Sequence, residues 1–344
     1  MANNDWQEYQ FIQGAVFNNE TISSFGNIQN ELIFTQNQSI ICDLSHLGLL
    51  EISGDDAVTF LQGQVTNDVK LLNATNAHYT GYCSPKGRLL ALFLAFSHNQ
   101  MLHLQINFKL LEPISKRLKM YVMRSKVNIN NVSDTVVKIG LNGNDVPVLL
   151  TTFFTKIPTQ TYESFSTESA TLIRLAGKTP RFEIICNTEL AKEIWQSLKT
   201  KCKPVGRACW EWLEIQAGIP DIYVQTQEQF VPQMVNLDLL DAINFKKGCY
   251  TGQEIVARTH YLGKVKRRTH LAHIKTSTPP QAGNDVMNAN SEAVGKVVRS
   301  APAPSGGYDV LAEIRLESVE TSDLTVDGVK VDIQRLPYEL NTVE

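Results

Sequence analysis

Three strand-like segments joined by two short turns constrain the fold of this chain more than any other feature of its sequence. The segments are residues 79–84, 88–96 and 101–106, and the turns are Pro85-Lys86-Gly87 and residues 97–100. Turns this short join neighbouring antiparallel strands, because a parallel connection needs a dozen residues or more. The sequence therefore predicts an antiparallel sheet, and hairpins in place of regular βαβ units favour an α+β fold.

The hydrophobic pattern predicts further strands and helices on both sides of this sheet. Strands are predicted at residues 31–34, 49–52 and 181–186. Four helices are predicted. The first carries Ala57, Phe60 and Leu61 on one face, and the second starts near Pro113 with Ile114, Leu118 and Tyr121 inward. The third starts after the cap Asn187, and the fourth spans residues 205–217 and ends before Gly218. A chain of 344 residues is long for one core, so we expect more than one domain.

The last part of the chain has a different character. Loops rich in proline or glycine, at residues 278–280 and 301–307, separate short strand-like segments. Asp327-Gly328 lies between two further segments of this kind and is a strong signal for a two-residue hairpin. We therefore predict a small antiparallel β-barrel domain over residues 269–344, which follows an α+β region over residues 1–268.

Composition and cysteine spacing exclude several classes of protein. Hydrophobic residues make up 43% of the chain and charged residues 19%, as in ordinary globular proteins. No apolar run approaches the roughly 20 residues that span a bilayer, and the N-terminus lacks a signal-like core, so we expect a soluble, cytoplasmic protein without membrane contact. The six cysteines form no CxxC pair and the seven histidines no HxxxH pattern, so neither disulfides nor a metal site are expected.

One short segment has the highest density of chemically special residues. Thr251 and Glu254 form a capping-box pattern, which predicts a helix over residues 252–261. Cys249 would precede the N-terminus of this helix and closely follows Lys246 and Lys247, so backbone amides and two ammonium groups would favour a thiolate or a bound anion. Cys249 is therefore the candidate catalytic residue. The alternative is an inert cysteine in a tight turn.

The same region concentrates positive charge on a chain whose net charge is −3. Between residues 246 and 268 there are seven basic residues and a single acid, Glu254. Such a basic island suggests a specific anionic partner. A solvated helix face is the alternative that the sequence leaves open.

The string KGCYTGQE, which begins at Lys247, resembles the signature of the YgfZ family of folate-binding proteins. This family is related to the aminomethyltransferase, or T-protein, of the glycine cleavage system. Other segments that match the family in order and spacing are residues 52–55, 60–69, 83–87, 215–220, 230–237 and 336–338, together with Trp210. On these matches the chain is identified as a member of the family.

The resemblance implies an α+β fold of the T-protein type, with two intertwined N-terminal α+β domains and a C-terminal β-barrel. A central cavity of this fold would hold tetrahydrofolate or a one-carbon derivative. Trp210 lies where the family carries a folate-contacting tryptophan, whereas Leu47 replaces a second tryptophan known in some members. Lys247 and Arg258 are the candidate cations for the glutamate tail, since charged donors bind carboxylates well.

The resemblance also implies an accessory role in the maintenance of iron–sulfur enzymes, including those that methylthiolate tRNA. Folate and an iron–sulfur enzyme such as a tRNA methylthiotransferase are then the expected partners. Aminomethyltransferases carry an acidic residue shortly after the glycine that corresponds to Gly87, but Arg88-Leu89-Leu90-Ala91 follows here. Without a carboxylate at that position, T-protein catalysis is not expected, and whether Cys249 supports a reaction stays open.

Two other functions are alternatives to this accessory role. The first is a folate-dependent one-carbon transferase that acts on a small amine. The second is an RNA-binding module that uses the cations at residues 264–268. Single-strand binding needs aromatic side chains among the cations, and in the sequence Tyr261 stands alone beside them. Direct nucleic-acid binding is therefore not expected from the sequence.

Overall fold

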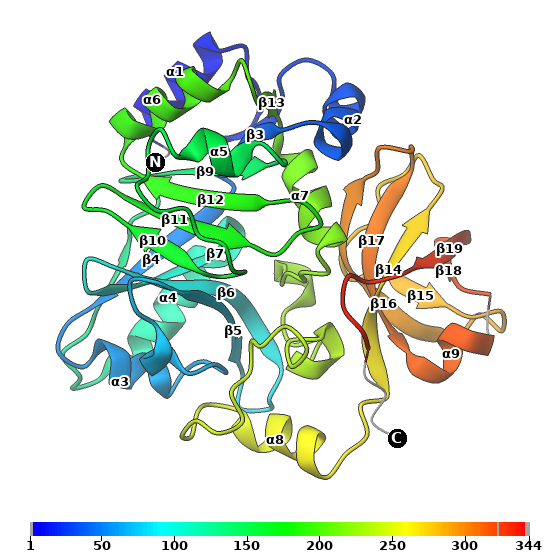
Figure 1. Ribbon diagram of the computed structural model, residues 1–344. Helices are drawn as coiled ribbons and strands as arrows, with labels where there is room; N and C mark the ends of the chain where they lie inside the picture. The colour runs from blue at the N-terminus through cyan, green and yellow to red at the C-terminus, as the bar shows by residue number, and fades with distance from the viewer. Residues whose placement is uncertain (1–2, 322, 341–344) are drawn as a thin grey trace.

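The computed structural model describes residues 3–321 and 323–340. Two β-sheets with their helices form the N-terminal part of the molecule, and a closed β-barrel lies beside them, next to helix α7 (Arg207–Gln216) (Figure 1). The sheets and helices occur in mixed order along the chain. The α+β class and the C-terminal antiparallel barrel predicted from the sequence are confirmed.

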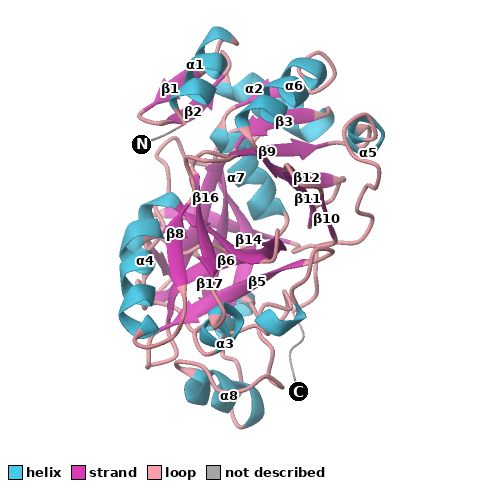
Figure 2. Cartoon of the chain, turned by 90° about the vertical axis from the view of Figure 1, so that its left-hand side faces the viewer, coloured by secondary structure: helices cyan, strands magenta, loops and turns pink. Residues whose placement is uncertain are grey.

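A five-stranded antiparallel sheet contains the three strands that the short turns predicted. Its order is β5-β6-β7-β4-β8. The strands are β4 (Leu47–Ser53), β5 (Ala77–Cys83), β6 (Leu89–His98), β7 (Met101–Asn107) and β8 (Asn128–Asn131). Helix α3 (Ala57–Gln62) follows β4, and helix α4 (Phe108–Val122) runs alongside the sheet with Ile114 and Leu118 buried (Figure 2).

A six-stranded sheet interlocks with the first one along the chain. Its order is β10-β11-β12-β9-β3-β13, in which β3 and β13 pair in parallel. The strands are β3 (Ile40–Asp43), β9 (Val137–Asn142), β10 (Ser164–Ser166), β11 (Ala170–Leu175), β12 (Arg181–Cys186) and β13 (Lys203–Val205). Because β3 precedes the whole five-stranded sheet and β9 follows it, the two N-terminal domains are intertwined.

The C-terminal barrel is closed in the order β14-β17-β16-β15-β18-β19. Its strands are β14 (Arg267–Ile274), β15 (Asp285–Met287), β16 (Ala293–Pro302), β17 (Tyr308–Arg315), β18 (Thr325–Val326) and β19 (Val329–Gln334). Asp327 and Gly328 have φ angles of 50° and 77°, the geometry of the predicted two-residue hairpin. The first barrel strand starts at Arg267, whereas the sequence placed the boundary after residue 268.

The remaining elements surround the two N-terminal sheets and the barrel. They are α1 (Asn4–Ile12), α2 (Ile28–Asn37), α5 (Val146–Leu150), α6 (Thr188–Leu198), α8 (Gln253–Tyr261), α9 (Leu316–Thr321), and the hairpin of β1 (Val16–Asn18) and β2 (Thr21–Ser24). As predicted, Asn187 caps α6 by accepting a hydrogen bond from the Leu190 amide, and Gly218 ends α7 with a φ of 69°. None of the described helices is long and apolar enough to cross a membrane.

The predicted strand at residues 31–34 is wrong, because these residues lie in α2. The Asn27 side chain accepts a hydrogen bond from the Asn30 amide and so starts a helix. Glu31 in the first turn of this helix is buried and accepts hydrogen bonds from the amides of Phe25 and Gly206. Only the Gly206 amide comes from a distant part of the chain, whereas Phe25 and the Asn27 cap are local.

The predicted start of α4 near Pro113 is also wrong. The helix begins at Phe108, and Pro113 lies inside it. Leu110 and Leu111 are buried, so the apolar face of the helix extends one turn ahead of the proline. Tyr121, which was expected to face inward, is 41% exposed.

Candidate functional site

Helix α7 directs two tryptophans to different neighbours. Trp210 is 1% exposed and packs against β9, where a Cβ atom at Gly140 would lie 2.5 Å from the indole ring. Gly140 therefore makes room for the tryptophan. Trp212 is buried on another side of the helix, and its Nε1 donates a hydrogen bond to Asp309 Oδ2 of the barrel at 2.8 Å. Trp212 thus joins α7 to the barrel.

Trp210 and Leu47 meet at one small cavity in the centre of the molecule. The cavity has a volume of about 50 Å³ and lies where α7 approaches both N-terminal sheets and the barrel. Leu47 contributes to it from β4, and its polar side chains are Gln105, Glu183, Glu214, Asp221, Asn107, His46 and Arg299. Two candidate site residues that are far apart in the sequence therefore line the same cavity.

Glu183 on β12 is the most unusual group in this cavity. Its side chain is 1% exposed, and Oε2 accepts a hydrogen bond from Gln105 Nε2 at 3.1 Å. Oε1 is buried and has no hydrogen-bond partner among the described residues. Burial raises the pKa of Glu183 from 4.5 to about 7, although the bond from Gln105 opposes the rise. A buried carboxylate with one free oxygen faces a cavity lined by an aromatic ring.

A network of buried ions fixes the surroundings of Trp210. The Arg181 guanidinium lies 5.1 Å from the centre of the Trp210 ring, and its Nη1 is 2.7 Å from Glu214 Oε1. Glu214 Oε2 is in turn 3.6 Å from Arg299 Nη1, which belongs to the barrel strand β16. The network ties the six-stranded sheet, α7 and the barrel together, so the cavity has a charged and ordered wall.

The KGCYTGQE segment lies against other parts of the chain that carry the family resemblance. The amide of Thr251 donates to the Gly63 carbonyl at 3.3 Å, and the amide of Asn244 donates to the Thr66 carbonyl at 3.0 Å. Segments 60–69 and 245–254 are therefore in direct contact. The motifs that are separate in the sequence form one continuous piece of structure.

The helix predicted over residues 252–261 is present as α8, but it is capped differently from the prediction. Gly252 has a φ of 83° and is the N-cap of α8, without a side-chain cap. A Cβ atom at this position would lie 2.5 Å from the Ser84 carbonyl oxygen. The predicted capping box of Thr251 and Glu254 is therefore wrong, because close packing of a glycine on the 84–87 turn sets the start of the helix.

Cys249 is exposed, whereas the other five cysteines are buried. Burial raises the pKa of Cys83, Cys186 and Cys209 to about 12, so these thiols are both hidden and hard to ionise. Tyr250, the next residue, is buried and turns the chain back toward the protein. The motif thus presents its sulfur at the surface, outside the wall of the central cavity.

Lys247 does not line the central cavity. Its side chain is 7% exposed, and Nζ donates hydrogen bonds to the carbonyl oxygens of Val65 at 2.6 Å and Asn67 at 2.7 Å. It also lies over the Tyr250 ring, 5.1 Å from the centre. Burial lowers the pKa of Lys247 from 10.5 to about 8. These contacts anchor the motif on segment 60–69.

The anchoring role of Lys247 gives a stability prediction. Lys247→Met leaves two buried carbonyls without a donor, which should lower the free energy of unfolding by about 1–3 kcal/mol for each carbonyl. Between pH 8 and 10.5 the unfolded chain binds the Lys247 proton and the folded chain does not, so wild-type stability should gain from a rise in pH in this window. Urea unfolding at several pH values measures both effects.

The exposed neighbour Lys246 supplies the control, since Lys246→Met removes the same charge from the same loop without an anchored ammonium group. Equal destabilisation by the two variants would contradict an anchoring role for Lys247.

Arg258, the other candidate cation, is exposed on α8 and also lies outside the central cavity. The structure therefore brings Trp210 and Leu47 together, and it places Cys249, Lys247 and Arg258 around the motif instead. Glu183 and its partner Gln105 were not predicted from the sequence. A signal was present, since Arg181 and Glu183 are charged residues in an otherwise apolar predicted strand, and buried charges of this kind concentrate at binding sites.

The family matches cover nearly all of the described chain. Residues 6–247 match the GCVT N-terminal domain, and residues 266–338 match the C-terminal beta-barrel domain of CAF17. The crystal structure of glycine cleavage system aminomethyltransferase T from Bartonella henselae is 16% identical, with a TM-score of 0.79 and coverage of 97% of this chain and 96% of that one. Fold and sequence together define a protein of the GCVT type.

Two curated relatives narrow this class. The tRNA-modifying protein YgfZ of Pectobacterium carotovorum subsp. carotovorum (strain PC1) is 31% identical over 324 residues, which cover 91% of this chain and 95% of the relative. The protein of the same name from Yersinia pestis (strain Pestoides F) is 30% identical over 312 residues, with coverage of 87% and 92%. The chain belongs to the YgfZ family.

Proposed function

We propose that this protein is a cytoplasmic, folate-binding accessory factor that supports iron–sulfur enzymes and tRNA modification, including methylthiolation. Its YgfZ relatives are named tRNA-modifying proteins, which supports the part of the proposal that concerns tRNA. Folate and a client such as a tRNA methylthiotransferase are the proposed partners. The tetrahydrofolate or one-carbon derivative is the proposed cofactor.

The observation that carries the folate proposal is the pairing of Glu183 with Trp210 in the central cavity. A pterin ring has adjacent N–H donors on one edge and two flat apolar faces. The free Oε1 of Glu183 can accept such donors, and the Trp210 indole can cover a ring face. A buried acceptor without a partner is costly for a protein, and a ligand that supplies the donor removes this cost.

The size of the cavity bears on how a ligand enters. At about 50 Å³ it is far smaller than the roughly 300–1,000 Å³ of typical small-molecule sites. Folate binding therefore requires lining side chains to move apart. Leu47 is half-buried and not locked by hydrogen bonds through its side chain, so it is suited to such a movement.

Strand β6 lacks the carboxylate that aminomethyl transfer of the T-protein type would need. The β6 side chains that face the cavity are Leu92 and Leu94, so this strand supplies no proton acceptor there. Arg88, at the turn, donates hydrogen bonds to the carbonyls of Glu228 and Gln229. Formation of methylene-tetrahydrofolate from a small amine donor would favour the transferase instead.

Calorimetric titration with tetrahydrofolate and its formyl and methylene forms tests the proposed site. Trp210→Ala should raise the dissociation constant about 5- to 150-fold, which corresponds to the loss of about 1–3 kcal/mol of ring contact. Trp210→Phe should have a smaller effect, because part of the ring face remains. Trp212→Phe is the matched control on the same helix, and it should leave folate affinity unchanged.

Folded Trp210 variants with wild-type affinity would remove this residue from the site. No binding of any folate form by the wild-type protein would remove folate from the proposal altogether.

A further inference from the structure

A second and much larger hollow lies between helix α8 and the barrel. It is a groove of about 1060 Å³, which is large enough for a nucleotide and its neighbours. In Figure 1 the segment that leaves α8 (yellow) leads directly to β14 at the barrel, so the groove lies beside this connection. The groove shares no lining residue with the central cavity.

Along this groove Phe245 lies beside two adjacent aromatic side chains of α8, His260 and Tyr261. The rings of Phe245 and His260 are stacked, with centres 3.7 Å apart and an angle of 11° between the planes. Tyr261 stands edge-on to both, with ring centres at 6.1 Å from Phe245 and 4.7 Å from His260, and it is 64% exposed. The sequence showed Tyr261 alone, but the fold adds two rings to it.

Positive charge dominates the polar lining of the groove. Five cations line it, Lys264, Lys266, Arg267, Arg268 and Arg315, against the two carboxylates of Asp238 and Glu317. Arg267 and Arg268 are held by Glu313 and Asp238. Lys264, Lys266 and Arg315 are exposed, and within residues 3–321 and 323–340 they form no ion pair. Three cations are therefore available to an anionic ligand.

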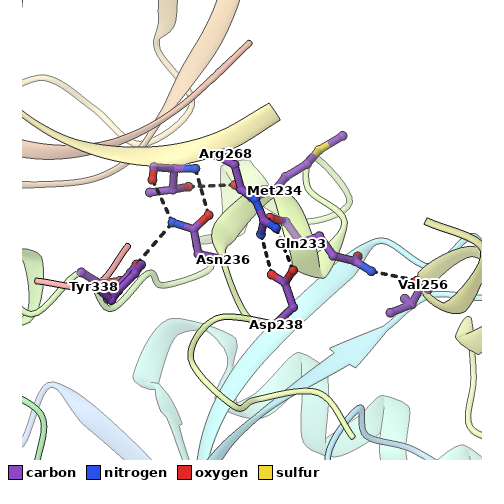
Figure 3. A network of polar contacts seen from close by, with 9 residues as sticks. Gln233, Met234, Asn236, Asp238, Val256, Arg268 and Tyr338 are labelled. Carbon is purple, nitrogen blue, oxygen red and sulfur yellow. Dashed lines mark hydrogen bonds and ion pairs between the residues drawn. The ribbon is translucent and has the colours of Figure 1, made fainter. Parts of the chain in front are cut away.

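Hydrogen bonds and an ion pair connect the residues at the floor of the groove, and Figure 3 shows this network. Arg268 binds Asp238 through two bonds of 2.6 and 2.9 Å and donates to the Gln233 carbonyl at 2.9 Å. Gln233 Nε2 in turn donates to the Val256 carbonyl in α8 at 2.7 Å. The barrel strand β14 and α8 are thus connected through residues 233–238, which fixes the distance between the aromatic rings and the cations.

We propose that this groove binds a single-stranded segment of RNA, with a base against Tyr261 and phosphates at Lys264, Lys266 and Arg315. Flat rings that stack on bases, next to cations that meet the backbone, are the elements of single-strand binding surfaces. An acidic peptide would use the cations but has no flat ring for the aromatic side chains. The choice of RNA rests on the proposed role in tRNA modification.

Fluorescence anisotropy with a labelled single-stranded oligoribonucleotide of mixed sequence tests the groove. The double variant Lys264→Glu/Lys266→Glu should weaken binding at least about ten-fold and lower the slope of log affinity against log salt by about 1.4. Tyr261→Ala should weaken binding about 5- to 100-fold with little change in this slope. Lys119→Glu/Lys178→Glu, which makes the same charge change at exposed sites elsewhere, should bind like the wild type.

Competition with heparin and with polyglutamate separates RNA from other anions, and tetrahydrofolate titration of the same samples keeps the two proposals apart. Loss of RNA binding with retained folate binding in the groove variants would support the groove and show that the fold is intact. Three results would overturn the proposal. The wild type does not bind RNA, or the control pair weakens binding as much as the groove variants do. The third is binding that is unchanged in Tyr261→Ala and is displaced equally well by polyglutamate. RNA binding without folate binding would overturn the proposed cofactor and leave the groove in place.

Discussion

Replacing Glu183 with glutamine is expected to weaken tetrahydrofolate binding about 10- to 150-fold at a pH near 8. The reason is that hydrogen bonds to a charged partner contribute about 1.5–3 kcal/mol, and the variant loses the charge at Oε1, the acceptor that the structure leaves free. The substitution keeps the shape of the side chain. Isothermal titration calorimetry at fixed ionic strength measures the effect directly.

The pH dependence of the wild type supplies a second readout. Because burial places the pKa of Glu183 at about 7, its carboxylate gains a proton as the pH falls through 7, and folate affinity should fall with it. In the Glu183→Gln variant the dependence near pH 7 should disappear, and any remaining dependence should lie near pH 6, the pKa of Asp221 in the same cavity. Glu211→Gln, the same change on α7 at a side chain outside the cavity, is the control. Equal affinity of wild type and Glu183→Gln at every pH would contradict a role for the carboxylate.

Replacing Cys249 with alanine is expected to abolish support of tRNA methylthiolation in cells that depend on this protein. The fold and folate affinity should remain, because the side chain is exposed and lies outside the central cavity. Mass spectrometry of methylthiolated tRNA nucleosides from complemented cells measures the loss. Lys119→Ala, a truncation of an exposed lysine on α4 outside the motif, should complement fully.

Alkylation of the purified protein tests the chemistry behind this prediction. Cys249 should react first among the six thiols, since the other five are buried and burial raises the pKa of Cys83 and Cys209 to about 12. Intact-mass measurements over time resolve the first modification. Full complementation by Cys249→Ala, or alkylation of Cys249 no faster than of the buried thiols, would return this residue to a structural role in the turn.

Elements of the fold were predicted correctly where the residues that determine them are close together in the sequence. The strands at residues 79–106 and the hairpin at Asp327-Gly328 depend on neighbours in the sequence, and both are correct. The burial of Glu31 in α2 and the cap of α8 depend on distant partners, the Gly206 amide and the Ser84 carbonyl. The helix predicted at residues 252–261 is present as α8, but the capping box was wrong because local rules do not contain the Ser84 contact. At α2 the Asn27 cap was a local helix signal, which the strand prediction did not use.

In the candidate site, too, some residues could be predicted from the sequence and others depend on contacts that form only on folding. Trp210 and Leu47 were placed by the family resemblance, and the structure brings both to one cavity. Lys247 was chosen for its charge, yet its ammonium group is committed to backbone carbonyls. The free oxygen of Glu183 is a property of three-dimensional packing, because it depends on which donors surround the side chain after folding. Sequence reasoning identified an aromatic wall but not the acceptor beside it.

The intertwined sheets also determine the order in which the two sheets can form while the chain is synthesised on the ribosome. Strand β3 pairs with β9 and β13, so Ile40 lies beside Asn142 and Lys203 in the finished sheet. All five strands of the smaller sheet are synthesised while β3 still lacks both neighbours. Ile40 and Ile41, which are fully buried in the native protein, stay open to other chains during this interval. A nascent chain stalled after β8 therefore carries all strands of the five-stranded sheet attached to an unpaired, apolar strand.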